Sequence, residues 1–102
     1  MRDLRQRLDK WLWFARLAKT RSLAARLVED GYVRVNGLRV TVPAKGLAVG
    51  DVVTVAAAHV TAILRVAELG ERRGPAPEAR RLYVDLAAGS GAAEDGPSPQ
   101  SS

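Results

Sequence analysis

Residues 7–40 decide the expected fold, and they read RLDKWLWFARLAKTRSLAARLVEDGYVRVNGLRV. Five apolar side chains in and just before this stretch recur at the spacing of one helical face: Leu4, Leu8, Trp11, Leu12 and Ala15. The spacing predicts a first helix over about residues 4–17. A second helix is expected to follow, because the hydroxyl of Thr20 or Ser22 can cap its start and Gly31 can take the left-handed conformation that ends it.

After Gly31 the apolar residues alternate at period two, which predicts an antiparallel hairpin. Its strands are expected at residues 32–35 and 38–42. Asn36-Gly37 between them is typical of a two-residue hairpin turn, since both positions tolerate positive φ.

Two further strands are expected at residues 52–55 and 60–66, after a loop at residues 44–47 that exposes Lys45. Residues 72–77 are rich in glycine and proline and predict a linker.

Residues 79–86, the last stretch with a regular apolar pattern, are compatible with either a helix or a strand. Its apolar residues have helical spacing, which favours a short C-terminal helix that would also cover Trp13 and Phe14. Alternation around Val84 leaves a strand as the alternative.

The expected fold is therefore α+β, with two N-terminal helices packed on a small, mainly antiparallel sheet and a short C-terminal helix. One domain is expected over residues 1–86. Residues 87–102 consist mainly of Gly, Ala, Ser and Pro and are expected to be disordered.

The charge is unevenly distributed along the chain. The 102 residues carry 16 Lys and Arg against 11 Asp and Glu, a net charge of +5. Residues 1–50 hold 11 basic and 4 acidic residues, whereas residues 51–102 hold 5 and 7. A positive charge concentrated on the helical half is typical of a protein that binds a polyanion.

Other function classes find little support in the sequence. The absence of cysteine excludes disulfides and thiolate metal sites, and no apolar run approaches the roughly 20 residues that a membrane span needs. The N-terminus lacks the pattern of a secretory signal, so a cytoplasmic protein is expected. No phosphate loop or nucleophile elbow is present, and the single His59 has no partner motif. We therefore expect no enzymatic activity, cofactor or metal.

The basic residues form a constellation on the predicted helices and hairpin, made up of Arg5, Arg7, Lys10, Arg16, Lys19, Arg21, Arg26, Arg34, Arg39 and Lys45. Arg suits phosphate recognition because its planar fork donates two parallel hydrogen bonds, and the first amides of the second helix add a further anion site. Trp11 is expected in the core, whereas Trp13 could pack under the last helix or stack on a base. Asp9 is expected to orient a nearby Arg.

Several short motifs, taken in order, resemble the S4-type RNA-binding domain over about residues 7–55. They are RLDKWLW at residues 7–13, KTRSLA at 19–24, GYV at 31–33, VNG at 35–37 and GD at 50–51. Within that superfamily the chain is similar to the ribosome-associated heat-shock protein 15 family, chiefly through DKWLW and KTRS. The C-terminal segment departs from that family, because it is short and slightly acidic rather than long and basic.

The resemblance implies an S4-like αL motif, in which two helices and the adjoining hairpin loop grip structured RNA, especially ribosomal RNA. It also implies a role in recycling free large ribosomal subunits that still carry a nascent chain on transfer RNA. Matching positions in this chain are Arg7, Lys10, Lys19, Thr20, Arg21, Ser22, Arg26, Asn36 and Lys45. Arg16 and Arg39 join these as RNA-binding candidates through the charge pattern. A monomer is expected.

Two alternatives stay open. Two short helices joined by a tight turn also fit a DNA-binding helix-turn-helix module, although the second helix offers no Asn or Gln to read bases. A protein-interaction module could instead use Trp13, Phe14 and Tyr83 as an apolar anchor.

Overall fold

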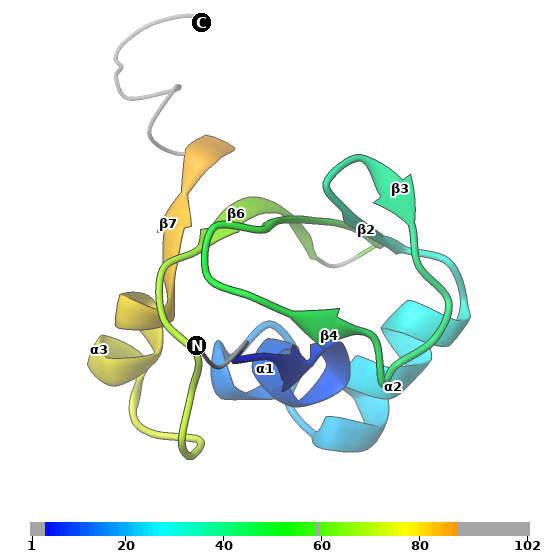
Figure 1. Cartoon of the computed structure of the whole chain (residues 1–102). Helices are drawn as coiled ribbons and strands as arrows, with labels where there is room; N and C mark the ends of the chain where they lie inside the picture. Colours follow the sequence, from blue (N-terminus) through cyan, green and yellow to red (C-terminus); the bar gives the residue numbers. More distant parts are fainter. Residues whose placement is uncertain (1–3, 59, 88–102) are drawn as a thin grey trace, which may run out of the picture.

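Two helices lie against one face of an antiparallel sheet in the computed structural model, which describes residues 4–58 and 60–87 (Figure 1). The elements follow one another as β1 (Gln6–Arg7), α1 (Leu8–Phe14), α2 (Arg21–Glu29), β2 (Val33–Val35), β3 (Leu38–Arg39), β4 (Gly46–Leu47), β5 (Val52–Ala56), β6 (Thr61–Val66), α3 (Ala76–Ala79), the 3-10 turn η1 (Arg80–Leu82) and β7 (Tyr83–Asp85). The predicted fold class is confirmed. The expectations for His59 and for the tail, apart from Ala87, lie outside the described residues.

The main sheet has the strand order β3-β2-β5-β6-β7, with every neighbouring pair antiparallel. At its centre Val33 pairs with Val55 and Val35 with Val53. All four valines are buried, whereas Arg34 between them is exposed. This alternation gives the sheet one apolar face, which the helices cover, and one face turned away from them.

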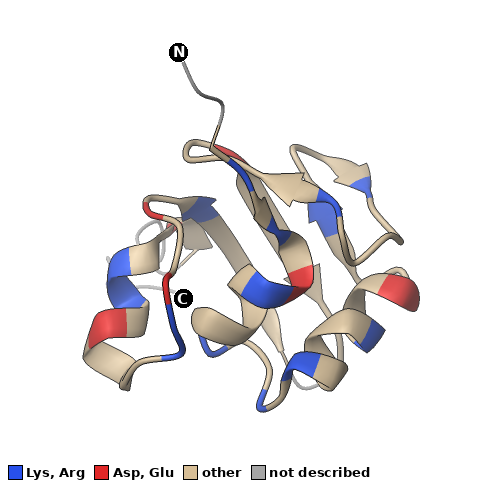
Figure 2. Ribbon diagram, turned by 60° about the horizontal axis from the view of Figure 1, so that its bottom comes forward, with Lys and Arg blue, Asp and Glu red and all other residues tan. Residues whose placement is uncertain are grey.

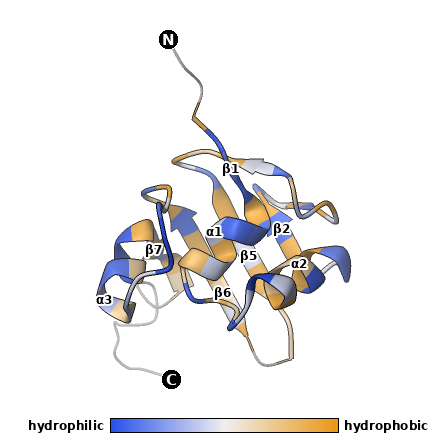
Figure 3. Ribbon diagram, turned by 90° about the horizontal axis from the view of Figure 1, so that it is seen from below, coloured by the Kyte–Doolittle hydropathy of each residue, from blue (hydrophilic) through white to orange (hydrophobic). Residues whose placement is uncertain are grey.

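The core forms between that apolar face and the two helices. Figure 3 shows the apolar parts of β2 and β5 behind α1 and α2. The helices contribute the buried side chains of Leu8, Trp11, Leu12, Phe14, Ala24 and Val28. Trp11 is fully buried and its Nε1 donates to the carbonyl oxygen of Glu68 at 3.1 Å, so its predicted place in the core is confirmed.

The first helix is shorter than predicted at its start. Residues 6 and 7 form a small separate sheet, in which Gln6 lies opposite Leu47 and Arg7 opposite Gly46. The backbone amide of Leu8 then donates to the carbonyl oxygen of Lys45 at 2.9 Å. A loop distant in the sequence therefore satisfies the first helical amides, and the expectation that residues 44–47 form only a loop was wrong.

Both helices end in the same kind of left-handed turn, at Arg16 (φ 66°) and Gly31 (φ 85°). In each turn two amides donate back to the last helical turn: Arg16 N to Trp13 O, Leu17 N to Leu12 O, Gly31 N to Val28 O and Tyr32 N to Leu27 O. The predicted end of α2 at Gly31 is confirmed. The predicted extension of the first helix to residue 17 was wrong, because Arg16 takes a conformation usually left to glycine.

The hairpin turn is confirmed, although its second strand is shorter than predicted. Asn36 (φ 53°) and Gly37 (φ 84°) both have positive φ, as a two-residue turn of this type requires. β3 comprises residues 38 and 39, with Arg39 opposite Arg34, and the amide of Val40 just after it still donates to the carbonyl oxygen of Val33 at 3.0 Å.

The predicted C-terminal helix was wrong at its end. The chain is helical over α3 and η1, but Tyr83–Asp85 form β7, which pairs with the edge of β6. Val84 lies opposite Arg65, so the alternative of a strand around Val84 is confirmed. Pairing satisfies the backbone groups of β6, which one more helical turn would have left open.

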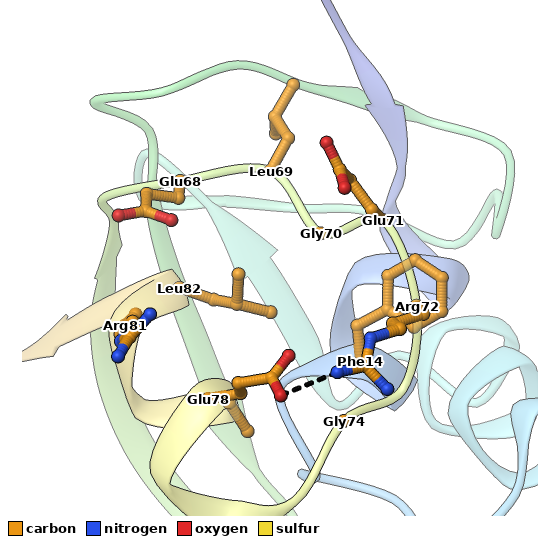
Figure 4. Close-up of a pocket in the computed structure, with 11 residues that line it drawn as sticks. Phe14, Glu68, Leu69, Gly70, Glu71, Arg72, Gly74, Glu78, Arg81 and Leu82 are labelled. Atoms are coloured by element: carbon orange, nitrogen blue, oxygen red, sulfur yellow. Dashed lines mark hydrogen bonds and ion pairs between the residues drawn. The ribbon is translucent and has the colours of Figure 1, made fainter.

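The segment before α3 is hydrogen-bonded to β1 and packs against α1. The side-chain amide of Gln6 bonds both the amide nitrogen and the carbonyl oxygen of Gly70, at 2.9 and 2.7 Å. Gly70 in turn lies against the ring of Phe14, in a hollow that Leu82 and Glu78 also line (Figure 4). The expected cover for Phe14 is therefore present, but it comes from this segment as well as from the C-terminal helix.

Candidate nucleic-acid interface

A buried carboxylate joins the beginnings of the two helices. Asp9, in the first turn of α1, is 3% exposed and receives two hydrogen bonds from Arg7: Nε to Oδ1 and Nη2 to Oδ2, both at 3.0 Å. Arg21, the first residue of α2, places its Nε 3.8 Å from Oδ2 of the same carboxylate. The prediction that Asp9 orients a nearby Arg is confirmed.

The two guanidinium groups decide the ionisation of Asp9. Burial alone would raise the pKa of this carboxyl, but the hydrogen bond and charge of Arg7, the charge of Arg21 and the backbone amide of Lys10 outweigh it and hold the pKa below its ordinary value. The same hydrogen bond raises the pKa of Arg7. Asp9 and Arg7 are therefore both charged at neutral pH.

The start of α2 adds further donors beside Arg21. Thr20 is the N-cap residue, and its Oγ1 accepts the amide of Leu23 at 3.1 Å. The side chains of Lys19, Arg21, Ser22 and Arg26 are exposed along the connection and the helix. Because Thr20 caps the helix, its side-chain oxygen is engaged within the protein, whereas that of Ser22 faces solvent.

The backbone of Lys45 lies beside the start of α1. Its carbonyl oxygen accepts the amide of Leu8, and its neighbour Gly46 pairs with Arg7. A groove beside it runs between the β2–β3 hairpin and residues 40–46, and Arg5, Asn36 and Arg39 also line this groove. Basic residues thus come from several segments of the chain, and Figure 2 marks their positions on the ribbon in blue.

Asn36 is used mainly to hold the fold. Its Oδ1 accepts the amide of Val52 at 2.9 Å and its Nδ2 donates to Asp51 Oδ1 at 3.2 Å. The side chain therefore links the hairpin turn to the Gly50-Asp51 turn. A contact of Asn36 with a ligand stays a prediction.

Three other predicted residues make different contacts from those of the helix junction, the group formed by Arg7, Arg21, Ser22 and Lys45 with the supporting residues Asp9 and Thr20. Lys10 is half-buried, with its Nζ 5.6 Å from the ring centre of Phe14. Arg16 donates from Nε to the carbonyl oxygen of Gly74 at 2.9 Å. Arg39 lies against Gly31, at the far end of α2 from Arg21.

The comparisons with known proteins agree on one family. A family model described as "S4 domain" matches residues 6–53. Heat shock protein 15 homolog from Aeromonas salmonicida is 43% identical over 82 residues, covering 80% of this chain and 61% of the relative. Heat shock protein 15 from Escherichia coli strain K12 is 41% identical over 79% of this chain and 60% of the relative. The chain thus spans about three fifths of the length of these curated relatives.

A solved structure is matched over most of its own length. Heat shock protein 15 from Vibrio cholerae, described as trimeric, is 42% identical, with a TM-score of 0.75 over 82% of this chain and 84% of that one. The chain belongs to the heat shock protein 15 family of S4-domain proteins. Small ribosomal subunit protein uS4 from Xanthobacter autotrophicus is also similar, at 39% identity over 84% of this chain and 40% of the relative.

The S4 match separates the helix junction from the segment that supports it. Residues 6–53 include Arg7, Asp9, Arg21 and Lys45. They do not include Glu68 or the rest of the C-terminal segment that bonds α1. In this heat shock protein 15 family member, the matched module therefore depends on contacts from beyond residues 6–53.

Two basic residues of the charge pattern, Arg5 and Arg34, lie outside the predicted set of site residues. Arg5 was noted in the charge pattern but not as a site residue, and it lines the groove beside Lys45. Arg34 is exposed on the sheet face turned away from the helices. Trp13 is half-buried and stacks on Phe14, with 5.4 Å between ring centroids, so packing accounts for much of its surface.

Among residues 4–58 and 60–87, no group of three or more His, Cys, Asp or Glu side chains is arranged to hold a metal ion. Over the same residues, no helix has the length and apolar character that crossing a membrane requires.

Proposed function

We propose that this protein binds structured RNA, and specifically ribosomal RNA within a ribosomal particle, through the helix junction. We define the helix junction as Arg7, Arg21, Ser22 and Lys45, with the supporting residues Asp9 and Thr20. The observation that carries the proposal is the convergence of β1, α2 and the loop before β4 on one carboxylate and one helix start.

The chemistry of the helix junction suits a phosphate backbone. The Arg7 and Arg21 side chains are 49% and 44% exposed, so both can reach a ligand while Asp9 stays buried. Guanidinium groups bind phosphate oxygens through paired hydrogen bonds, and the start of α2 carries the partial positive charge of a helix N-terminus. Such contacts grip the backbone without reading sequence, as is common for folded RNA.

Exchange of one charge tests the placement of the site. Arg21→Glu is expected to weaken binding to a structured ribosomal RNA fragment by at least about tenfold, because it reverses a phosphate contact. Arg65→Glu makes the same charge change on the exposed sheet face, where the side chain has no described partner, and serves as the matched control. Fluorescence anisotropy measures both dissociation constants, with circular dichroism to verify folding. Equal losses in the two variants would contradict the helix junction as the site.

The type of nucleic acid is tested by competition. Structured RNA is expected to displace the labelled fragment, whereas polyuridine and duplex DNA should compete poorly. Affinity should also fall with salt at a log–log slope of about −0.7 to −0.9 per neutralised phosphate. Salt-insensitive binding to a protein partner, or better competition by duplex DNA, would instead support the alternatives of an interaction module or a helix-turn-helix protein.

The finer proposal is a role in recycling large ribosomal subunits that carry a nascent chain on transfer RNA. Membership of the heat shock protein 15 family supports it, while similarity to a small-subunit protein makes the choice of subunit the decisive point. Sucrose-gradient sedimentation of lysate before and after heat shock tests it. Co-migration with free large subunits is the expected result, and a peak with small subunits would contradict it.

We further propose that the RNA-binding unit is a monomer, because Arg7, Asp9, Arg21 and Lys45 all come from one chain. The Vibrio cholerae relative is described as trimeric, which makes the mass of this protein worth measuring directly. Sedimentation velocity with and without RNA is expected to give the mass of one chain per RNA site. Binding only by a larger assembly would contradict the monomer.

A further inference from the structure

The contacts of Asp9 leave the outer edges of two arginines available. Arg7 uses Nε and Nη2 for the carboxylate, which leaves Nη1 without a described partner. The Nε of Arg21 lies 3.8 Å from the Asp9 carboxylate, an ion pair too long for a hydrogen bond. The N–H groups of the Arg21 guanidinium therefore have no described hydrogen-bond partner. One carboxylate therefore faces two half-exposed guanidinium groups that retain free N–H donors.

The position of Asp9 is itself fixed from the backbone. Its amide donates to the carbonyl oxygen of Pro43 at 3.1 Å, and the preceding amide of Leu8 donates to Lys45 at 2.9 Å. Arg21 starts a helix whose cap, Thr20, is hydrogen-bonded. Hydrogen bonds thus hold the carboxylate and the backbones of both arginines in place. Only the long arginine side chains keep rotamer freedom that ligand binding would remove.

A negative charge at this place has two opposing effects on an anionic ligand. Its repulsion weakens phosphate binding, although the effect is shared among two cations and screened by salt. Its hydrogen bonds hold the side chain of Arg7 and its charge attracts that of Arg21, and both side chains would otherwise lose rotamer freedom when they bind. Because Asp9 is buried behind the guanidinium groups and bonds Arg7 through both oxygens, the second effect outweighs the first.

We infer that Asp9 is a positioning residue that holds Arg7 and Arg21 together as a subsite for one phosphodiester group of RNA. The inference rests on the proposed RNA-binding function and adds to it a defined phosphate position between α1 and α2. Arg7 and Arg21 contact the phosphate, and Asp9 acts only through them.

The direction in which Asp9→Asn changes RNA affinity distinguishes a positioning role from a purely electrostatic one. Asp9→Asn removes a negative charge from a basic surface, so charge alone predicts tighter RNA binding. Positioning predicts the opposite, a dissociation constant raised by about tenfold, as expected when two long side chains must be ordered by the ligand. Glu29→Gln makes the same charge change on an exposed residue of α2 with no described partner, and it should leave the dissociation constant within about twofold.

The salt dependence of RNA affinity gives a second readout, and a loss of protein stability would not change it in the same way. If Asp9→Asn releases one phosphate contact, the log–log slope of affinity against salt should become shallower by about 0.7 to 0.9. An unchanged slope in a folded Asp9→Asn variant, or binding as tight as that of the wild type, would overturn the inference.

The arginines provide a test that does not depend on the folding of an Asp9 variant. If Arg7 and Arg21 share one phosphate, Arg7→Gln and Arg21→Gln should each weaken binding, and the double variant should lose much less than the product of the two losses. Additive losses would overturn the shared subsite while leaving RNA binding intact. Failure of the wild-type protein to bind any RNA would overturn the proposed function as well, so the two failures are distinguishable.

Discussion

Single side chains at the start of each helix decide both stability and the arrangement of the candidate site. Asp9 and Thr20 both lie at helix starts, Asp9 in the first turn of α1 and Thr20 at the cap of α2. Asp9 bonds side chains from other elements, whereas Thr20 bonds the backbone of its own helix. Their removal is therefore expected to have different consequences.

Thr20→Ala should lower the free energy of unfolding by about 1 kcal/mol, because the amide of Leu23 loses its cap. Thr20→Ser keeps the hydroxyl and should retain most of that stability. Ser22→Ala, at an exposed residue two positions further on, should change it by less than about 0.5 kcal/mol. Urea unfolding at pH 7 measures all three, and an equal loss for Thr20→Ala and Ser22→Ala would contradict the assignment of Thr20 as the cap.

Asp9 should make stability depend on pH on the acid side. Its folded-state pKa lies below the ordinary value, so ionised Asp9 stabilises the fold above about pH 4, and this contribution is lost as the pH falls through the folded pKa. Asp9→Asn should therefore be less stable than the wild type at pH 7, and the difference should shrink below about pH 4. Urea unfolding from pH 7 to pH 2.5 tests this. A difference that stays constant with pH would show that the charge of Asp9 does not contribute.

At the scale of elements, α1 depends on partners that are far away in the sequence. Seven residues make a short helix, and an isolated helix of that length is unstable in water. β4 and its loop form hydrogen bonds with the start of α1. The segment before α3 accepts hydrogen bonds from Trp11 within the helix and from Arg16 just after its end. The helix that carries Asp9 is therefore held from both sides.

Gly70→Ala tests this docking. A Cβ at residue 70 would lie 2.5 Å from Cδ2 of the buried Phe14 ring, so either the ring or the segment must move. We expect a loss of about 1–3 kcal/mol in the free energy of unfolding. Gly46→Ala is the matched control, since its Cβ would meet only the side chain of Arg5, at 3.1 Å, and should cost less. Equal stability of wild type and Gly70→Ala would show that the segment is not closely packed on α1.

For the whole molecule, the S4 match ends inside β5, yet the core continues beyond it. Val55, Leu64, Val66 and Leu82 are buried and belong to the same apolar cluster as Trp11. A chain limited to the matched region would expose the apolar face that these residues close. The helix junction therefore needs a domain larger than the family motif.

Two truncations should separate the domain from the rest of the chain. Residues 1–87 are expected to keep the thermal midpoint of the full chain within a few degrees, because the composition of the remainder predicts disorder. Residues 1–66 lose Leu82 and the contacts of Glu68 and Gly70, and they should not unfold cooperatively. Circular dichroism melting measures both. Cooperative unfolding of the 1–66 chain would contradict the dependence of α1 on the C-terminal segment.

The sequence by itself determined the features that depend on neighbouring residues. Thr20 as a possible cap, Gly31 as a helix end and Asn36-Gly37 as a turn are set by local backbone preferences, and the structure confirms each. The alternation of the strand residues likewise fixed which valines face the core. Local hydrogen bonds and side-chain periodicity act over a few residues, so a pattern is sufficient to reveal them.

Only the tertiary structure decided the features that depend on distant partners. Residues 6 and 7 pair with residues 46 and 47 instead of extending α1, and residues 83–85 pair with β6 instead of extending a helix. The charge pattern and the family resemblance together named eleven candidate residues but not their grouping: Asp9 joins Arg7 to Arg21, while Arg16 and Lys10 turn toward other contacts. Backbone pairing and ion pairs between segments release their free energy only when the chain has folded, and for that reason the local sequence does not encode them visibly.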